Sequence, residues 1–279
     1  MMKSIIRLLI VLALACAPSV LFAQTSFSWE RKAMDASRTG VKASSSDNVK
    51  ECMGYVRGRR YYAPNGRVFK GGSVRRVAEK VLAVQPEMAD VKQVVAYSTA
   101  EMTAHKPESA LSDWFVDILM QETAERSGKK VDIGFANFGG IRVSMPEGDV
   151  LLDDIMSMFP FKNTLCYLDL RGSDVRGILE QMAAEGFQVI GGVRCVSKDR
   201  KLVSATVDGK PLEDDKIYGV ATISFLLDGG DGYSIAKNAV SLQMLPDYII
   251  DAVLPYVKRL TAEGKPIEYK ADGRVQILK

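Results

Sequence analysis

Apolar residues recur at three- and four-residue spacing in several parts of the chain, which predicts amphipathic helices there. The clearest case begins at Ser109, a residue type that caps helices, and its apolar face is formed by Leu111, Trp114, Phe115, Ile118 and Leu119. Three further helices are expected: one capped by Ser73, one from Val175 that ends at Gly186, and one from Ile250 to Val257 that Pro255 should bend or break.

Runs of β-branched and aromatic residues between these helices predict short strands. They cover residues 94–97, 131–136, 165–170, 193–196, 202–207, 217–222 and 275–278. Helices and strands do not alternate regularly, so the pattern favours the α+β class over a doubly wound parallel sheet. We therefore expect mixed sheets covered by helices.

The first residues do not belong to this pattern. Lys3 and Arg7 precede an apolar run that ends at Ala23, which is typical of a secretory signal peptide over residues 1–23. The run is too short for a membrane-spanning helix. The chain is therefore expected to be secreted, to a periplasm or a cell surface. The alternative is a lipoprotein anchored at Cys16.

Residues 24–92 read as an N-terminal extension with a polar lead-in, a hairpin that turns at Pro64-Asn65-Gly66, and the helix capped by Ser73. Arginines and tyrosines interleave in the hairpin, as they do on nucleic-acid-binding faces. The whole chain carries a net charge of only +3, however, and about +1 once Lys3 and Arg7 are removed with the leader. Such a balance gives no support to nucleic-acid binding, and a hairpin with one solvated side is the better interpretation.

Three cysteines follow the leader: Cys52, Cys166 and Cys195. None of them has the C-x-x-C spacing of a zinc or redox site. Cys166 and Cys195 fall on predicted strands, and both a disulfide between them and two buried thiols fit the sequence.

The most informative stretch is Asp228-Gly229-Gly230-Asp231-Gly232-Tyr233, with Phe225 six residues before Asp231. Adjacent glycines let a ligand approach the backbone closely. A carboxylate between them is a good acceptor for sugar hydroxyls, and the flanking aromatic rings can stack on a flat heterocycle. Taken alone, the string also fits a tight loop.

Three upstream segments fit the same picture: Asn137-Phe138-Gly139-Gly140-Ile141-Arg142, Phe159-Pro160-Phe161-Lys162-Asn163, and Leu170-Arg171-Gly172 before a helix. In this order and spacing, the four motifs resemble the C-terminal, substrate-binding domain of the 5′-nucleotidase / UDP-sugar hydrolase family. The resemblance covers residues 93–279 and implies an α+β, 5′-nucleotidase C-terminal-domain-like fold.

The resemblance also implies roles for individual residues. Phe161 and Phe225 match the pair of rings that sandwich a nucleobase, and Asp231 matches the acceptor for the ribose hydroxyls. Two amides, Asn137 and Asn163, match positions that hydrogen-bond around the substrate.

The residues that would bind the phosphate match the family less completely than those for the base and the sugar. Arg142 matches an arginine that faces the phosphate, where a guanidinium can bind with two parallel hydrogen bonds. The family's further arginines before the helix at Ser109 are replaced here by Glu101, His105 and Lys106. This departure puts phosphate binding by the chain alone in doubt, although Lys106 supplies a point charge.

Family members hydrolyse phosphate esters at a two-metal site in a separate calcineurin-like domain, which needs several histidines and carboxylates. This sequence has a single histidine, His105, which is expected on a surface loop. We therefore expect no catalytic residue and no cofactor in this chain, with divalent metals on a partner phosphatase chain.

The leading hypothesis is the nucleotide- or nucleoside-binding half of a secreted 5′-nucleotidase-type hydrolase, inactive alone and acting with a calcineurin-like metallophosphatase chain. The alternative is a freestanding, non-catalytic nucleotide- or nucleoside-binding protein. A third interpretation is a degenerate domain with a structural role, which predicts no nucleotide binding.

Overall fold

A computed structural model describes residues 49–278 of the chain. The predicted signal peptide, the alternative anchor Cys16 and the lead-in up to residue 48 lie outside these residues and stay predictions. No helix among the described residues is long and apolar enough to cross a membrane.

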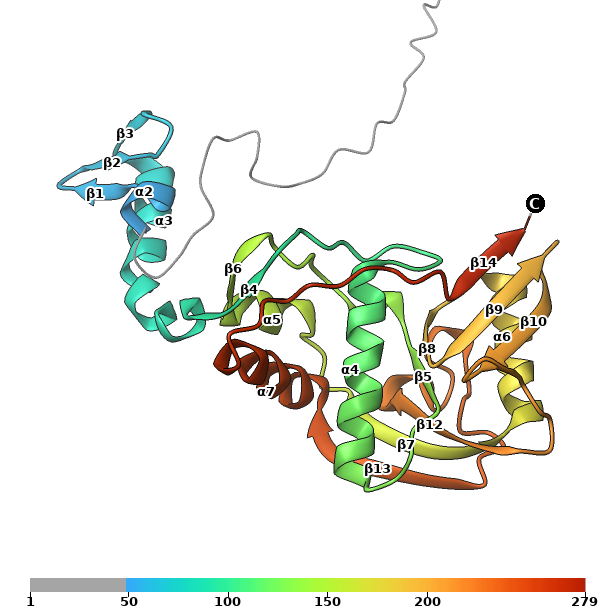
Figure 1. The fold of residues 1–279 in the computed structure, drawn as a ribbon. Helices are drawn as coiled ribbons and strands as arrows, with labels where there is room; N and C mark the ends of the chain where they lie inside the picture. Colours follow the sequence, from blue (N-terminus) through green and yellow to red (C-terminus); the bar gives the residue numbers. More distant parts are fainter. Residues whose placement is uncertain (1–48, 279) are drawn as a thin grey trace, which may run out of the picture. The chain divides into compact units, whose positions relative to one another are not determined.

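The centre of the fold is a mixed five-stranded sheet (Figure 1). In spatial order its strands are β13 (Ser241–Tyr248), β7 (Thr164–Arg171), β12 (Ile217–Ile223), β5 (Ile133–Ala136) and β8 (Val189–Gly191). Strand β12 pairs antiparallel with β7 and parallel with β5. The carboxyl ends of β5 and β12 and the amino end of β7 therefore lie at the same edge of the sheet, which is where the predicted site residues are expected to meet.

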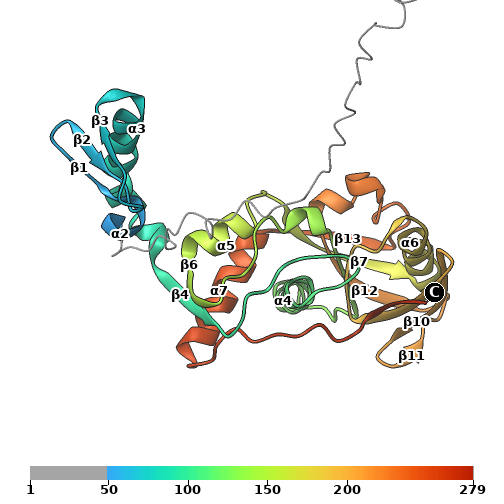
Figure 2. The same cartoon turned by 90° about the horizontal axis from the view of Figure 1, so that it is seen from above.

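Helix α4 (Ala110–Ser127) packs against all five strands of this sheet, and Figure 2 views it end-on. Its predicted cap is confirmed, because the Ser109 side chain accepts a hydrogen bond from the backbone N–H of Ser112. Trp114 and Phe115 are 2% and 1% exposed. Burying one such side chain stabilises a fold by roughly 1.5–3 kcal/mol, so the apolar face of α4 is a main anchor of the core.

Helix α7 (Ile249–Ala262) packs against α4 and runs through Pro255, so of the two predicted effects of this proline, a bend or a break, the break does not occur. Proline removes the N–H that would bond the carbonyl of Asp251, one turn earlier. The Nη2 group of Arg126, on α4, donates to that carbonyl at 3.0 Å instead. Arg126 and Arg259 also both pair with the fully buried carboxylate of Glu122, which ties the two helices together.

A four-stranded sheet lies beside the first. Its strands are β11 (Lys210–Pro211), β10 (Lys201–Val207), β9 (Val193–Lys198) and β14 (Val275–Leu278). Helix α6 (Gly172–Glu185) packs against β10 and β7 and ends at Gly186, as predicted.

The cysteines are free and buried in the described part of the chain. Cys166 lies on β7 and Cys195 on β9, in different sheets. Of the two alternatives, the structure therefore has two buried thiols and not a disulfide. Burial raises the pKa of the Cys166 thiol to about 11 and that of Cys195 to about 12, which keeps both protonated.

Smaller elements complete this part of the chain. They are the paired strands β4 (Val94–Ser98) and β6 (Gly148–Leu151), helix α5 (Leu152–Met158), and the 3₁₀ turns η2 (Gln85–Met88), η3 (Asp90–Lys92), η4 (Phe138–Gly140), η5 (Ser224–Leu226) and η6 (Gly230–Gly232). The turns η4, η5 and η6 carry the predicted motifs.

Residues 49–84 are the first segment that the structure describes. This segment has helix α2 (Val49–Met53), a three-stranded antiparallel sheet and helix α3 (Gly72–Ala83), which packs on the three strands. The strands are β1 (Tyr55–Arg57), β2 (Arg60–Tyr62) and β3 (Val68–Lys70), and the predicted turn at residues 64–66 joins the last two. The predicted cap at Ser73 is wrong: Gly71 and Gly72, both at positive φ, turn the chain, and the helix is capped by Gly71, two residues earlier.

Candidate functional site

The predicted site residues lie at the edge of the central sheet where β5 and β12 end and β7 begins. Asn137 directly follows β5, Phe225 lies two residues after β12, and Phe161 and Asn163 lie just before β7. The backbone N–H of Thr164 donates to Oγ of Ser224 at 3.0 Å, which joins the segment of Phe161 to that of Phe225.

Asn137 and Asp231 form the polar centre of this site. Nδ2 of Asn137 donates a hydrogen bond to Oδ2 of Asp231 at 2.8 Å. Because a carboxylate only accepts, this bond fixes the orientation of the amide. Oδ1 of Asn137 then points elsewhere, and it is buried without a hydrogen-bond partner among the described residues. An unpaired buried acceptor costs free energy, and it is tolerated here as part of the arrangement that fixes Asp231.

Glycines set the shape around these two side chains. A Cβ on Gly140 would lie 2.8 Å from Oδ1 of Asn137, and one on Gly230 would lie 1.9 Å from the carbonyl oxygen of Phe225. The turn that presents Asp231 thus packs directly on the backbone of Phe225. Asp231 itself is exposed and has φ of 48°, in the left-handed region that Asp tolerates better than most residues.

Both predicted stacking residues are open to solvent. The side chains of Phe161 and Phe225 are 45% and 42% exposed, whereas their neighbours Phe159 and Leu226 are buried. Large exposed rings at a polar site are available to a ligand, and their exposure argues against a role in the core.

Arg142 lies over Phe161. Its guanidinium carbon is 5.8 Å from the ring centroid, and Nη1 donates to the carbonyl of Gly139 at 3.2 Å. The remaining donors of the exposed guanidinium can bind an anion beside the ring. Asn163 lies one residue before β7, and its carbonyl accepts a hydrogen bond from the N–H of Ile249 at 3.1 Å. The side chain of Asn163 has no hydrogen bond to another described residue.

A cavity of about 430 Å³ adjoins Asp231. Lys106, Glu185, Gln188 and Tyr233 contribute polar groups to its wall. Oε1 of Gln188 accepts from the N–H of Phe138 at 3.1 Å and so holds the turn that follows Asn137. No sequence signal points to Gln188, because it lies outside the four motifs. His105, the single histidine, is exposed in a loop.

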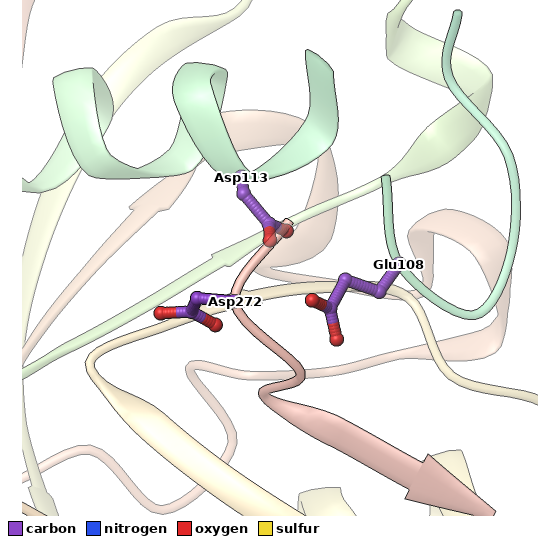
Figure 3. Close-up of side chains that lie close together, drawn as sticks. All are labelled: Glu108, Asp113 and Asp272. Atoms are coloured by element: carbon purple, nitrogen blue, oxygen red, sulfur yellow. The ribbon is translucent and has the colours of Figure 1, made fainter. Parts of the chain in front are cut away.

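The described residues include one group of carboxylates close enough to share a cation: Glu108, Asp113 and Asp272 (Figure 3). Arg274 is buried beside them, with Nε 3.4 Å from Oδ2 of Asp113 and 3.1 Å from Oδ1 of Asp272. Its guanidinium supplies the positive charge that a metal ion would bring. The group also has no histidine, so it does not fit a dimetal phosphatase centre.

This carboxylate group instead fastens the C-terminal segment to the start of α4. Glu108 accepts the backbone N–H groups of Gly273 at 2.6 Å and Val275 at 2.9 Å, and Arg274 pairs with both oxygens of Asp117. Burial, opposed by Arg274 and aided by Glu108, raises the pKa of Asp113 to about 7.

The fold and the site together define an α+β domain in which a polar centre and exposed aromatic rings share one sheet edge. The family model described as "5′-nucleotidase, C-terminal domain" matches residues 88–238, more than half of the chain. The chain therefore belongs to the 5′-nucleotidase C-terminal domain family, which confirms the predicted resemblance and fold class.

Known proteins agree with this assignment. The chain is 31% identical over 170 residues to protein UshA of Yersinia enterocolitica, which covers 57% of this chain and 29% of that protein. It is 27% identical over 214 residues to the trifunctional nucleotide phosphoesterase protein YfkN of Bacillus subtilis, over 68% of this chain and 14% of that protein. The chain thus spans less than a third of the length of either relative.

Among solved structures, the 5′-nucleotidase precursor from Thermus thermophilus has a similar fold. It superposes with a TM-score of 0.65 at 23% identity, over 79% of this chain and 49% of that one.

Proposed function

We propose that this chain is the nucleotide- or nucleoside-binding half of a secreted 5′-nucleotidase-type hydrolase, and that a separate calcineurin-like metallophosphatase chain supplies the metals and the hydrolytic chemistry. The observation that carries the proposal is the meeting of Asn137, Asp231, Phe161 and Phe225 at one sheet edge. Family membership supports the substrate class.

Each group has a physical task in this proposal. The rings of Phe161 and Phe225 stack on the base, for which aromatic stacking contributes roughly 1–3 kcal/mol. Asp231 accepts the two ribose hydroxyls, and Asn137 holds that carboxylate in place. Arg142 binds the phosphate beside the ring of Phe161.

The requirement for a partner follows from the ligands that hydrolysis needs. In-line hydrolysis at two metals requires several histidines and carboxylates around the cations. The sequence has one histidine, and it lies in an exposed loop. The divalent metals are therefore assigned to the partner chain, and no catalytic residue is assigned to this one.

Two measurements test the proposal. Titration calorimetry of the purified chain should show binding of adenosine and AMP. Adding a secreted calcineurin-like metallophosphatase chain from the same genome, with Mn²⁺, should then raise phosphate release from AMP above that of either chain alone.

The freestanding binding protein remains the alternative, because the open rings and the Asn137–Asp231 pair would serve it equally well. It predicts the calorimetric result without any gain in activity on mixing. Absence of nucleoside binding would favour the third interpretation, a domain with a structural role.

A further inference from the structure

A second surface lies on residues 49–84, outside the residues that match the family model. We refer to these residues as the basic module. Its helix α3 buries none of its side chains, and Val74, Val77 and Val81 are 46%, 60% and 42% exposed. Together with Met53 and Tyr61 they line an apolar groove of about 480 Å³.

The basic module buries few of its own apolar side chains. Of residues 49–84, all of which the structure describes, Cys52 is the one buried apolar side chain. A surface that covers the groove would supply the missing burial.

The net charge of the basic module indicates what kind of surface would cover its groove. The basic module holds nine lysines and arginines against two glutamates, a net charge of +7. Residues 85–279 hold 22 basic and 29 acidic residues, a net charge of −7. The near-neutral net charge of the chain therefore conceals a strongly basic module. A surface complementary in charge to this module is acidic.

The aromatic residues of the basic module argue against a nucleic acid as the occupant. Tyr55 stacks on Tyr62 with centroids 4.8 Å apart, and Tyr61 stacks on Phe69 at 5.9 Å. Lys50 and Arg67 lie over the Tyr55 and Phe69 rings. Stacking platforms for bases need free ring faces, and here the rings are engaged with one another and with cations. A concave groove lined by valines fits protruding side chains of a protein.

The position of the basic module along the chain favours one protein as the occupant of the groove. The matched domain is a C-terminal domain, and the chain covers 29% of UshA and 14% of YfkN, so most of each relative lies outside the match. The module comes directly before the domain, where the rest of such an enzyme is joined. We propose that the apolar groove and the basic surface around it bind the separate metallophosphatase chain, through an acidic surface with apolar side chains at its centre; this inference rests on the proposed function.

The test uses the full chain and a purified, Mn²⁺-loaded, secreted calcineurin-like metallophosphatase chain from the same genome. Val77→Asp places a carboxylate in the groove, and Ala83→Asp places one on the exposed end of the same helix, outside the groove. Val77→Asp should weaken association about tenfold or more, as expected for a central apolar contact, while Ala83→Asp should change it by less than about twofold. Association should also weaken as salt is raised.

The outcomes separate this inference from the proposed function. Circular dichroism and adenosine binding should be unchanged in Val77→Asp, which shows that the variant is folded. If the wild-type chain activates the phosphatase and Val77→Asp binds it equally well, the docking inference is wrong and the proposed function stands. If no phosphatase chain binds, or if the basic module binds RNA, anionic vesicles or a second copy of this chain instead, the docking inference is overturned; adenosine binding then decides whether the freestanding alternative holds.

Discussion

Asn137 and Asp231 lie 94 residues apart in the sequence, and their side chains are joined by a hydrogen bond of 2.8 Å. The bond connects the turn after β5 to the glycine-rich turn after β12. Since β5 and β12 run parallel, both turns lie at the same sheet edge. The arrangement leaves Oδ1 of the exposed Asp231 as an acceptor for a ligand, whereas Oδ1 of Asn137 is buried.

Asp231→Asn should weaken the binding of ribonucleosides more than the binding of their 2′,3′-dideoxy analogues. The bonds from ribose hydroxyls to a carboxylate are charge-assisted, and losing them costs roughly 1.5–3 kcal/mol. Calorimetry with adenosine and 2′,3′-dideoxyadenosine measures the difference. Asp228→Asn, an exposed acid of the same turn, is the matched control and should affect neither ligand. Equal losses for both ligands would mean that Asp231 shapes the turn and does not contact the sugar.

Phe161→Ala and Phe225→Ala should each weaken nucleoside binding by about 1–3 kcal/mol, the contribution of one stacked ring. Because the two rings are 45% and 42% exposed, the melting temperature should fall little. Tyr97→Ala removes an aromatic ring that is 54% exposed and is not one of the predicted site residues, so it should leave affinity unchanged. Unchanged affinity in both phenylalanine variants would show that the rings do not hold the base.

Gly230→Ala should damage the site through the backbone. The added Cβ would lie 1.9 Å from the carbonyl oxygen of Phe225, so the turn must shift, at a cost of roughly 1–3 kcal/mol. Gly177→Ala, in α6 with open space around it, should instead stabilise the chain by about 0.4–1 kcal/mol. Denaturant unfolding and adenosine titration check both variants. A Gly230→Ala protein with native stability and affinity would contradict the close packing.

Much of this arrangement could be predicted from the sequence, because it depends on local signals. The cap at Ser109, the end of α6 at Gly186 and most strand positions follow from residue type and spacing. Long-range polar partners have no such signal. Arg126 replaces the lost N–H of Pro255 across two helices, and only the folded chain shows why α7 continues. The hydrogen bond that Gln188 accepts from the N–H of Phe138 likewise has no signal in the sequence.

The pairing of Arg274 with Asp113 and Asp117 was likewise not predictable, since the partners lie about 160 residues apart. Composition concealed a further feature. The total charge of +3 argued against a charged binding surface, but in that total the +7 of the basic module is cancelled by the −7 of residues 85–279.

Asp113→Asn should make stability less dependent on pH. Burial raises the pKa of this carboxyl to about 7 in the folded chain, from 3.8 in its reference state. Between these values the folded state holds the proton more tightly than the unfolded state, so the contribution of Asp113 to stability falls as pH rises towards 7. The variant should therefore gain stability relative to wild type between pH 5 and pH 8, measured by urea unfolding at both. The exposed Asp149→Asn is the control, and an equal difference from wild type at the two pH values would contradict the prediction.

The purified chain, incubated with AMP and Mn²⁺, Mg²⁺ or Zn²⁺, should release no phosphate above background at any pH. Two-metal hydrolysis needs two cations, a bound hydroxide and groups that stabilise the developing charge. The described residues bring three carboxylates together at Glu108, Asp113 and Asp272, but Arg274 already pairs with two of them and no histidine joins the group. Near Asp231 the other acid of the turn is Asp228, which is exposed. A malachite green assay after two orthogonal columns measures release. Metal-dependent release that co-purifies with the chain and is abolished by Arg142→Ala would overturn the assignment of hydrolysis to a partner, because the phosphate site and the chemistry would then belong to one polypeptide.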